Sequence, residues 1–316
     1  MKKALITGIS GFAGSYLSEN LVSSGYQVSG SYLTDDSLKN LPNKDKVSLH
    51  KVNLLDEGAV EELLGKEKPE YIFHLAALTS PKNSFDDPKN TFVNNVSAQI
   101  NLLESVCKNK LTDSRILIVS SAEVYGLVPK DDLPIDEDTK FNPANPYAVS
   151  KLAQDFLGLQ YFHSYKLNIV RVRPFNHVGP RQSPDFIVSA LAKRIAEIEK
   201  GRENVMKVGN LTSKRDFTDV SDMVEAYRLA LEKGEAGQVY NLGSGKSFEI
   251  SEILDKLLSF SKVKIKTEED QSLMRPSDNP DLVCDARKFE KLTGWKAQIP
   301  IEKTLENTLN YWRNNL

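Results

Sequence analysis

Residues 4–14 read A-L-I-T-G-I-S-G-F-A-G, and this stretch decides the fold expected for the chain. Its apolar run, residues 4–6, is typical of a buried parallel strand, and residues 15–21 have helical character. The turn between them contains three glycines, Gly8, Gly11 and Gly14. Because glycine has no Cβ and a helix start offers free N–H groups, such a turn can hold a pyrophosphate. We therefore predict a dinucleotide site, although G-x-x-G-x-x-G is not the commoner spacing and an ordinary tight turn also fits the pattern.

Composition narrows the class of protein. Of the 316 residues, 40% are hydrophobic, and the formal net charge is −2, so a core is expected and a basic nucleic-acid-binding face is not. Cys107 and Cys284 have neither metal-ligand spacing nor a disulfide pattern, so no metal is expected. The first strand begins too early for a signal peptide, and no apolar stretch reaches the roughly 18 residues of a membrane span. We expect a soluble, cytoplasmic protein with no nucleic-acid or membrane partner.

Beyond the glycine turn, apolar runs alternate with helical segments such as residues 57–66. The further expected strands are residues 27–31, 47–52, 71–75, 115–120 and 169–173. Strands separated by helices predict an α/β fold with a doubly wound, parallel, Rossmann-type sheet. Ligands of such sheets bind at the carboxyl ends of the strands, so we expect the chemistry near Gly8, Ala76, Ser121 and Pro174.

After Pro174 the pattern changes to loops and mixed segments. We expect a helix over residues 186–199, a helix capped by Asp219, and a strand over residues 238–242 that returns to the sheet. This predicts a discontinuous second lobe. The expected dinucleotide-binding domain comprises residues 1–173 and 217–244, and the smaller C-terminal substrate lobe comprises residues 174–216 and 245–316.

Two helical segments carry regular apolar stripes. Their members are Val93, Val96, Ile100, Leu103 and Val106 in the first segment and Val149, Leu152, Phe156, Leu159 and Tyr161/Phe162 in the second. From the spacing alone, both stripes are expected to face the sheet.

Tyr147 and Lys151 in N-P-Y-A-V-S-K stand four residues apart at an expected helix start, so their side chains share one face. A phenol with a pKa near 10 is a poor acid–base group at neutral pH, and a nearby ammonium lowers that pKa. The pair is common on exposed helices and means little alone. The hydroxyl of Ser121, which follows the strand over residues 115–120, adds a group that can hold a substrate oxygen beside the phenol.

The same residues carry a family resemblance that runs nearly end to end. The motifs are T-G-I-S-G-F-A-G (7–14), H-L-A-A (74–77), N-N-V (94–96), S-S-A-E-V-Y-G (120–126), P-Y-A-V-S-K (146–151), R-P-F-N-H-V-G-P (173–180), R-P-S-D-N-P (275–280) and T-G-W-K (293–296). They resemble the extended short-chain dehydrogenase/reductases, and within them the sugar-nucleotide branch.

The resemblance implies roles for individual residues. Tyr147 is the acid/base, Lys151 its partner and ribose anchor, and Ser121 the group that positions the carbonyl. The implied contacts to NAD(P)H are Gly8, Gly11, Phe12, Ala13, Gly14, Asn53, Leu54, Ala76, Ala77, Asn95, Tyr147 and Lys151. Many relatives have Asp in place of Asn53, so that contact departs from the family pattern.

For the substrate, the resemblance implies a GDP-sugar whose diphosphate is bound by basic and amide side chains. The implied substrate contacts are Ser121, Asn176, Arg181, Arg215 and Arg275. Guanidinium groups and an amide suit a dianion. Relatives dimerise through the two striped helices, so a homodimer is implied as well.

Three functions remain open at this stage. The loop motifs resemble the GDP-4-keto-6-deoxy-D-mannose reductases, which reduce a C4 ketone to give GDP-D-rhamnose. The alternative is a GDP-mannose 4,6-dehydratase, or another nucleotide-sugar dehydratase or epimerase, in which Glu123 is a base. Reductases of this kind can retain the same carboxylate, so Glu123 does not separate the two functions. A non-catalytic dinucleotide sensor is disfavoured by the tyrosine–lysine pair. For the cofactor, we expect NAD or dual use, because residues 31–33 include no arginine and Asp35 and Asp36 come late.

Overall fold

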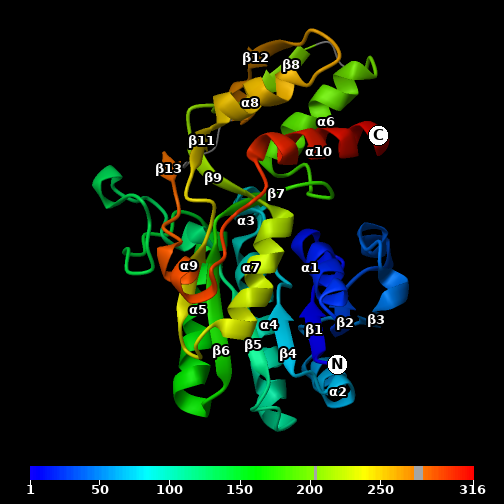
Figure 1. Cartoon of the computed structure of the whole chain (residues 1–316), viewed down its shortest axis with the longest axis vertical. Coiled ribbons are helices and arrows are strands. Elements are labelled where there is room, and N and C mark those ends of the chain that lie inside the picture. Colours follow the sequence, from blue (N-terminus) through cyan, green and yellow to red (C-terminus); the bar gives the residue numbers. More distant parts are fainter. Residues whose placement is uncertain (203–204, 274–279) are drawn as a thin grey trace.

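The computed structural model describes residues 1–202, 205–273 and 280–316. A seven-stranded sheet, in the order β10-β6-β5-β4-β1-β2-β3, forms the lower part of the molecule in Figure 1. All its neighbouring strands are parallel. The strands are β1 (Lys3–Thr7), β2 (Gln27–Tyr32), β3 (Ser48–Lys51), β4 (Tyr71–His74), β5 (Arg115–Val119), β6 (Asn168–Pro174) and β10 (Val239–Leu242). The predicted doubly wound parallel sheet is confirmed.

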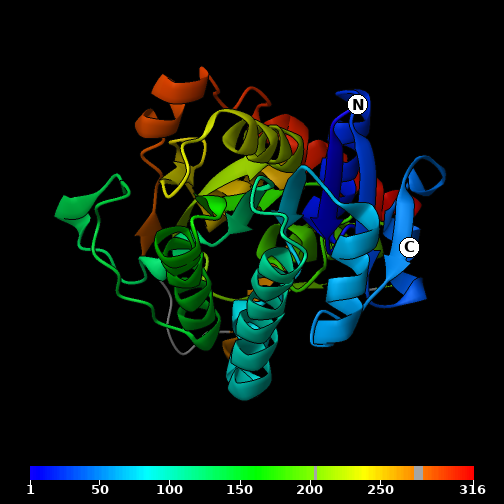
Figure 2. The same cartoon turned by 90° about the horizontal axis from the view of Figure 1, so that it is seen from below.

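Helices cover both faces of this sheet, as Figure 2 shows from below. One face packs against α1 (Phe12–Ser23) and α7 (Val220–Lys233), which meet in one hydrophobic core. The other packs against α2 (Glu57–Glu67), α4 (Pro88–Lys108) and α5 (Pro146–Tyr165), with the short α3 (Pro81–Asp86) beside α5. As predicted, Asp219 caps α7, and its carboxylate accepts a hydrogen bond from Ser221 N at 2.8 Å.

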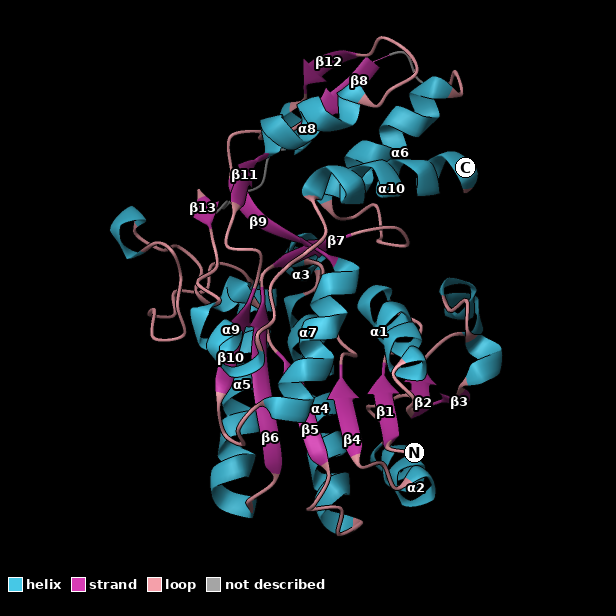
Figure 3. Cartoon of the chain, in the orientation of Figure 1, coloured by secondary structure: helices cyan, strands magenta, loops and turns pink. Residues whose placement is uncertain are grey.

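A second layer stands above the carboxyl ends of the strands (Figure 3). Its strands are β7 (Asn176–Val178), β8 (Val205–Val208), β9 (Lys214–Asp219), β11 (Ser247–Glu249), β12 (Lys266–Glu269) and β13 (Asp281–Leu282). Three helices, α6 (Ile187–Glu199), α8 (Ile250–Ser259) and α10 (Ile301–Asn314), share their own core, which includes Leu191, Ile253 and Leu305. The chain enters this layer after β6, leaves it at α7, and enters it again after β10.

One segment of the predicted substrate lobe packs elsewhere. Helix α9 (Arg287–Thr293) lies against α7 and β10, and Phe289 and Trp295 belong to the core on that face of the large sheet. The indole of Trp295 donates a hydrogen bond to Asp222 O at 3.1 Å, which anchors the segment. Helix α9, which the predicted boundaries assign to the substrate lobe, thus packs on one face of the large sheet.

The apolar stripes of α4 and α5 do not both face the sheet. Leu103 and Val106 are buried as predicted, but Val93 is 44% exposed, and on α5 Val149 and Phe156 are 43% and 48% exposed. Helix α5 instead buries a largely polar face, with Tyr147, Ser150, Lys151, Gln154, Asp155, Gly158 and Tyr161 inward. The prediction from spacing was wrong there, because the polar face of α5 has functional and structural partners inside the protein.

In the described ranges, every helix is too short or too polar to cross a membrane. The cytoplasmic location stays a prediction.

Candidate active site

A cavity of about 1010 Å³ follows the carboxyl ends of the large sheet, between it and the upper layer. Its lower wall includes Gly8 after β1, Ala76 after β4 and Ser121 after β5. Its upper wall includes Leu191 of α6 and Val208 of β8. The strand ends thus meet at one cavity, as a doubly wound sheet predicts.

The glycine turn forms one end of this cavity with no room for larger residues. Gly8 has φ +72°, and a Cβ built there would lie 3.0 Å from the Cα of Ala76. A Cβ on Gly14 would lie 2.2 Å from the carbonyl oxygen of Gly8. Gly11 caps α1 without a side-chain hydrogen bond, so the first N–H groups of the helix have no capping side chain. This cradle fits a dinucleotide pyrophosphate on steric and electrostatic grounds.

Other predicted cofactor residues lie along the same cavity. Phe12, Ala13, Asn53, Leu54 and Ala77 all line it, together with the glycines and Ala76. Phe12 stacks on His177, with ring centroids 5.8 Å apart.

Asn95 differs from the other predicted cofactor residues, because it is fully buried and its neighbour Asn94 lines the cavity instead. The Asn95 amide accepts from Leu78 N at 2.7 Å and donates to Leu78 O and Ser150 Oγ. Asn95 therefore fixes the loop after β4 onto α5.

Helix α5 presents the tyrosine–lysine pair to the cavity. Asn145 caps the helix by accepting from Ala148 N at 2.8 Å, and Pro146 occupies its first position. Tyr147 and Lys151 then lie one turn apart, and both line the cavity. The Lys151 ammonium donates to Val119 O at 2.9 Å, which holds the lysine against the end of β5.

Burial sets the protonation of this pair. It raises the pKa of Tyr147, more than the hydrogen bond with Ser121 lowers it, and the negative charge of Glu123 raises it further. Burial also lowers the pKa of Lys151 to about 7. The net shift of the phenol pKa is therefore upward, opposite to the lowering expected from the ammonium, because desolvation is its largest cause.

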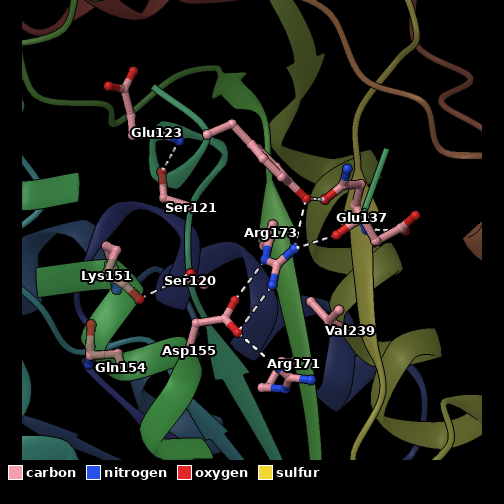
Figure 4. Close-up of polar contacts among 12 residues, drawn as sticks. Ser120, Ser121, Glu123, Glu137, Lys151, Gln154, Asp155, Arg171, Arg173 and Val239 are labelled. Atoms are coloured by element: carbon pink, nitrogen blue, oxygen red, sulfur yellow. Dashed lines mark hydrogen bonds and ion pairs between the residues drawn. The ribbon is translucent and has the colours of Figure 1, made fainter. Parts of the chain in front are cut away.

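Ser121 and Glu123 stand on the short turn after β5, η3 (Ala122–Val124), and both line the cavity. The Ser121 hydroxyl caps the turn by accepting from Glu123 N at 3.2 Å (Figure 4). The Glu123 carboxylate accepts from the side-chain amide of Asn145 at 3.0 Å. The cap of the tyrosine-bearing helix thus also orients this carboxylate.

The predicted substrate residues separate into three groups. Asn176 and Arg215 line the cavity, and Arg275 lies outside the described residues. Arg181 is not among the residues that line the cavity. Its guanidinium binds Glu19 at 2.6 Å and lies 3.6 Å from the ring centroid of Tyr16 on α1, so its predicted substrate contact is not retained.

Three further cations line the cavity and were missed in the sequence, and the first of them is Lys82 of α3. Arg194 belongs to α6, and Lys207 belongs to β8. Ile187, Leu191 and Arg194 all line the cavity and are spaced by four and three residues, a helical pattern that offered a signal. Lys207 offered none, because a lone exposed lysine in a short strand looks like an ordinary surface charge.

Comparison with known proteins gives a consistent result. The family model described as GDP-mannose 4,6 dehydratase matches residues 5–308. GDP-6-deoxy-D-mannose reductase of Pseudomonas aeruginosa is 33% identical over 316 residues, which cover 100% of this chain and 98% of that protein. GDP-mannose 4,6 dehydratase 1 of Arabidopsis thaliana is 31% identical over 96% of this chain and 88% of that protein.

Solved structures agree with this similarity. RMD from Pseudomonas aeruginosa, complexed with NADPH, superposes with a TM-score of 0.88 at 32% identity and covers 100% of both chains. UDP-glucose 4-epimerase of Thermus thermophilus, in complex with NAD, superposes with a TM-score of 0.89 at 28% identity over 99% of this chain and 100% of that one. This chain therefore shares its fold with two proteins whose structures contain a nicotinamide dinucleotide.

Proposed function

The chain belongs to the GDP-mannose 4,6 dehydratase family, and within it we propose a reductase that converts GDP-4-keto-6-deoxy-D-mannose to GDP-D-rhamnose with NAD(P)H. The observation that carries this proposal is the meeting of Ser121, Tyr147 and Lys151 at one cavity with the glycine cradle. The full-length similarity to a GDP-6-deoxy-D-mannose reductase supports the choice of reaction.

The residues divide the chemistry as follows. Bound in the cavity, the reduced nicotinamide supplies the hydride. The Ser121 hydroxyl donates a hydrogen bond to the C4 carbonyl oxygen, and Tyr147 donates the proton that the developing alkoxide needs. The Tyr147 phenol is protonated at neutral pH, as a proton donor requires, and burial raises its pKa further from neutrality. Lys151 adds positive charge beside the phenol when it is protonated.

The two lobes divide the ligands in this proposal. Residues 1–173 and 217–244 bind the dinucleotide, and residues 174–216 and 245–316 bind the sugar nucleotide. Asn176, Arg194, Lys207 and Arg215 supply an amide and cations along the cavity, and these suit the diphosphate. Arg275 is kept as a substrate residue on the sequence resemblance alone.

A dehydratase is the second candidate, and the position of Glu123 favours it. This carboxylate lines the same cavity as Tyr147 and is oriented by Asn145, as a base acting on the sugar would need. An epimerase is a further candidate of this class, because the chain has the fold of a UDP-glucose 4-epimerase.

A spectrophotometric assay separates these functions. Purified protein with GDP-4-keto-6-deoxy-D-mannose is expected to consume NADH or NADPH stoichiometrically, followed at 340 nm, because the reaction uses external reductant. Glu123→Gln is expected to change kcat less than about threefold, since proton donation is assigned to Tyr147. Conversion of GDP-mannose to a keto sugar without added reductant, lost in Glu123→Gln, would instead establish the dehydratase.

The same assay compares the two cofactors, and we propose dual use. Ser31, at the end of β2, lines the cavity, as do Ser10 and Ser37. The hydroxyl oxygens of Ser10 and Ser37 are 2.7 Å apart. Asp35 is held by Lys51 at 2.6 Å. Hydroxyl groups accommodate either a ribose hydroxyl or a phosphate, whereas a free carboxylate would repel the phosphate of NADPH.

We also propose a homodimer formed by α4 and α5. These adjacent helices expose Phe92, Val93, Val149 and Phe156, each at least 41% accessible, on the side away from the sheet. Apolar side chains gathered on neighbouring helices are typical of an interface.

The dimer is tested by light scattering after size exclusion. The wild-type protein is expected at about twice the 35.4 kDa of the chain. Val93→Lys is expected to shift it towards monomer, because dimerisation would then bury a charge beside the apolar side chains of the proposed interface. Val263→Lys is the matched control, since Val263 is equally exposed at 43% but lies after α8. A monomeric wild-type protein would contradict the proposal.

A further inference from the structure

A buried charge cluster lies one helical turn beyond the catalytic pair. Asp155 follows Lys151 by four residues on α5, and its side chain is fully buried. Its carboxylate accepts from Arg171 Nη1 at 2.5 Å and from Arg173 Nε and Nη2 at 2.8 and 3.3 Å (Figure 4). Both arginines belong to β6, the second strand from the β10 edge, so the cluster ties α5 to this part of the sheet.

Arg173 also reaches a third segment. Its Nη1 donates to the hydroxyl of Tyr125 at 2.9 Å and to the main-chain carbonyl oxygen of Glu137 at 3.2 Å. The Tyr125 hydroxyl in turn donates to the Asn241 amide oxygen at 2.7 Å, on β10. Tyr125 is fully buried and ends the turn η3, two residues after Glu123.

One guanidinium therefore connects all three parts of the active site. Asp155 stands on the helix of Tyr147 and Lys151, and Tyr125 stands on the segment of Ser121 and Glu123. Arg173 itself lies three residues before Asn176. In the described structure, the cavity is lined by Ser121, Tyr147 and Asn176 but not by the cluster that connects them.

The composition of the cluster is informative because buried charges are costly. Apolar residues of similar size usually serve stability as well or better, so the benefit we assign to this buried ionic network is a fixed geometry. The Asp155 carboxylate and the Arg173 guanidinium are hydrogen-bonded, whereas Arg171 Nε has no partner in the described structure. Here the fixed quantity is the position of α5 relative to the turn that carries Ser121.

We infer that Tyr125, Arg173 and Asp155 are positioning residues that hold the Ser121 hydroxyl and the Tyr147 phenol at the separation the reaction needs. This inference rests on the proposed function. It assigns no contact with substrate or cofactor to the three residues. Their effect on the rate arises because misplacement of reacting groups by about 1 Å can lower a rate by about a hundredfold.

Tyr125→Phe tests the inference, because it removes one hydroxyl and keeps the ring. We expect kcat to fall about tenfold or more, with the Kd for NADPH, measured by fluorescence titration, unchanged within twofold. The primary isotope effect with 4-deuterated cofactor should rise as hydride transfer becomes slower. Tyr161→Phe is the matched control, because it also removes a hydrogen-bonded hydroxyl from a buried tyrosine. Tyr161 belongs to α5, and its hydroxyl binds Glu104 on α4, outside the cluster.

A second measurement needs no substrate. Hydrogen exchange of the NADPH-loaded protein should become faster in Tyr125→Phe over both residues 120–126 and 146–152, and remain as in the wild type in Tyr161→Phe. Arg173→Lys should give the same pattern more strongly, because an ammonium cannot bridge Asp155 and Tyr125 as the guanidinium does.

The outcomes separate the two proposals. A wild-type protein that consumes no cofactor with the keto sugar contradicts the proposed function, and hydrogen exchange then decides the positioning role alone. In an active enzyme, an unchanged kcat in Tyr125→Phe overturns the inference. Without an active enzyme, unchanged exchange over residues 120–126 overturns it.

Discussion

Tyr147→Phe is expected to lower kcat by about 10³-fold, because positioned general acids contribute about 10² to 10⁴ to a rate. The substitution removes only the phenolic oxygen. The residue is buried against the strand ends, and the phenylalanine ring fills the same space, so the fold should be kept. Single-turnover oxidation of NADPH in the presence of the keto sugar measures the loss directly.

Two controls give this result its meaning. The Kd for NADPH should stay within about threefold of the wild type, since the glycine cradle and Lys151 are unchanged. Tyr165→Phe alters an exposed tyrosine at the far end of the same helix, and its kcat should equal that of the wild type. Residual activity of Tyr147→Phe above one tenth of the wild type would remove Tyr147 from its assigned role.

Much of the fold was predictable because its signals are local. The apolar run before Gly8 and the alternation of strands and helices identify the parallel sheet, whereas connection rules only reduce the number of possible strand orders. The sheet-facing stripe predicted on α5 was wrong for a physical reason. Its buried face pairs Lys151 and Asp155 with β5 and β6, and periodicity of apolar residues cannot show polar partners that distant strands provide.

The candidate site was predictable where spacing along one element suffices, as with Tyr147 and Lys151. The pKa shifts of these two side chains were not predictable, because their burial depends on the whole fold. Arg181 shows the same limit, since only the structure reveals that its guanidinium lies on Tyr16 and binds Glu19. Tyr125 and Asn241 are 116 residues apart, so their hydrogen bond leaves no trace in the sequence pattern.

Gly14→Ala is expected to weaken NADPH binding by about tenfold or more, which corresponds to about 1.4 kcal/mol. Two effects compete, since alanine favours a helix over glycine by about 1 kcal/mol, while overpacking costs about 1 to 3 kcal/mol. The added Cβ would lie 2.2 Å from Gly8 O and 3.0 Å from the Cα of Ile9, so steric repulsion wins. Gly8 must move, and the cradle moves with it. Fluorescence titration with NADPH measures the change, and Tm is expected to fall.

Gly58→Ala separates this steric argument from a general effect of alanine. Gly58 also stands in the first turn of a helix, α2, but its added Cβ would meet only Asp56 Oδ1, at 3.6 Å, an ordinary contact. Helix propensity then acts unopposed, so stability should rise by about 0.5 to 1 kcal/mol while the Kd for NADPH is unchanged. If Gly14→Ala and Gly58→Ala had the same effect on stability and on the Kd for NADPH, the glycine turn would accommodate the added Cβ without a loss of free energy. The close approach of Gly14 to Gly8 would then not determine the shape of the cofactor site.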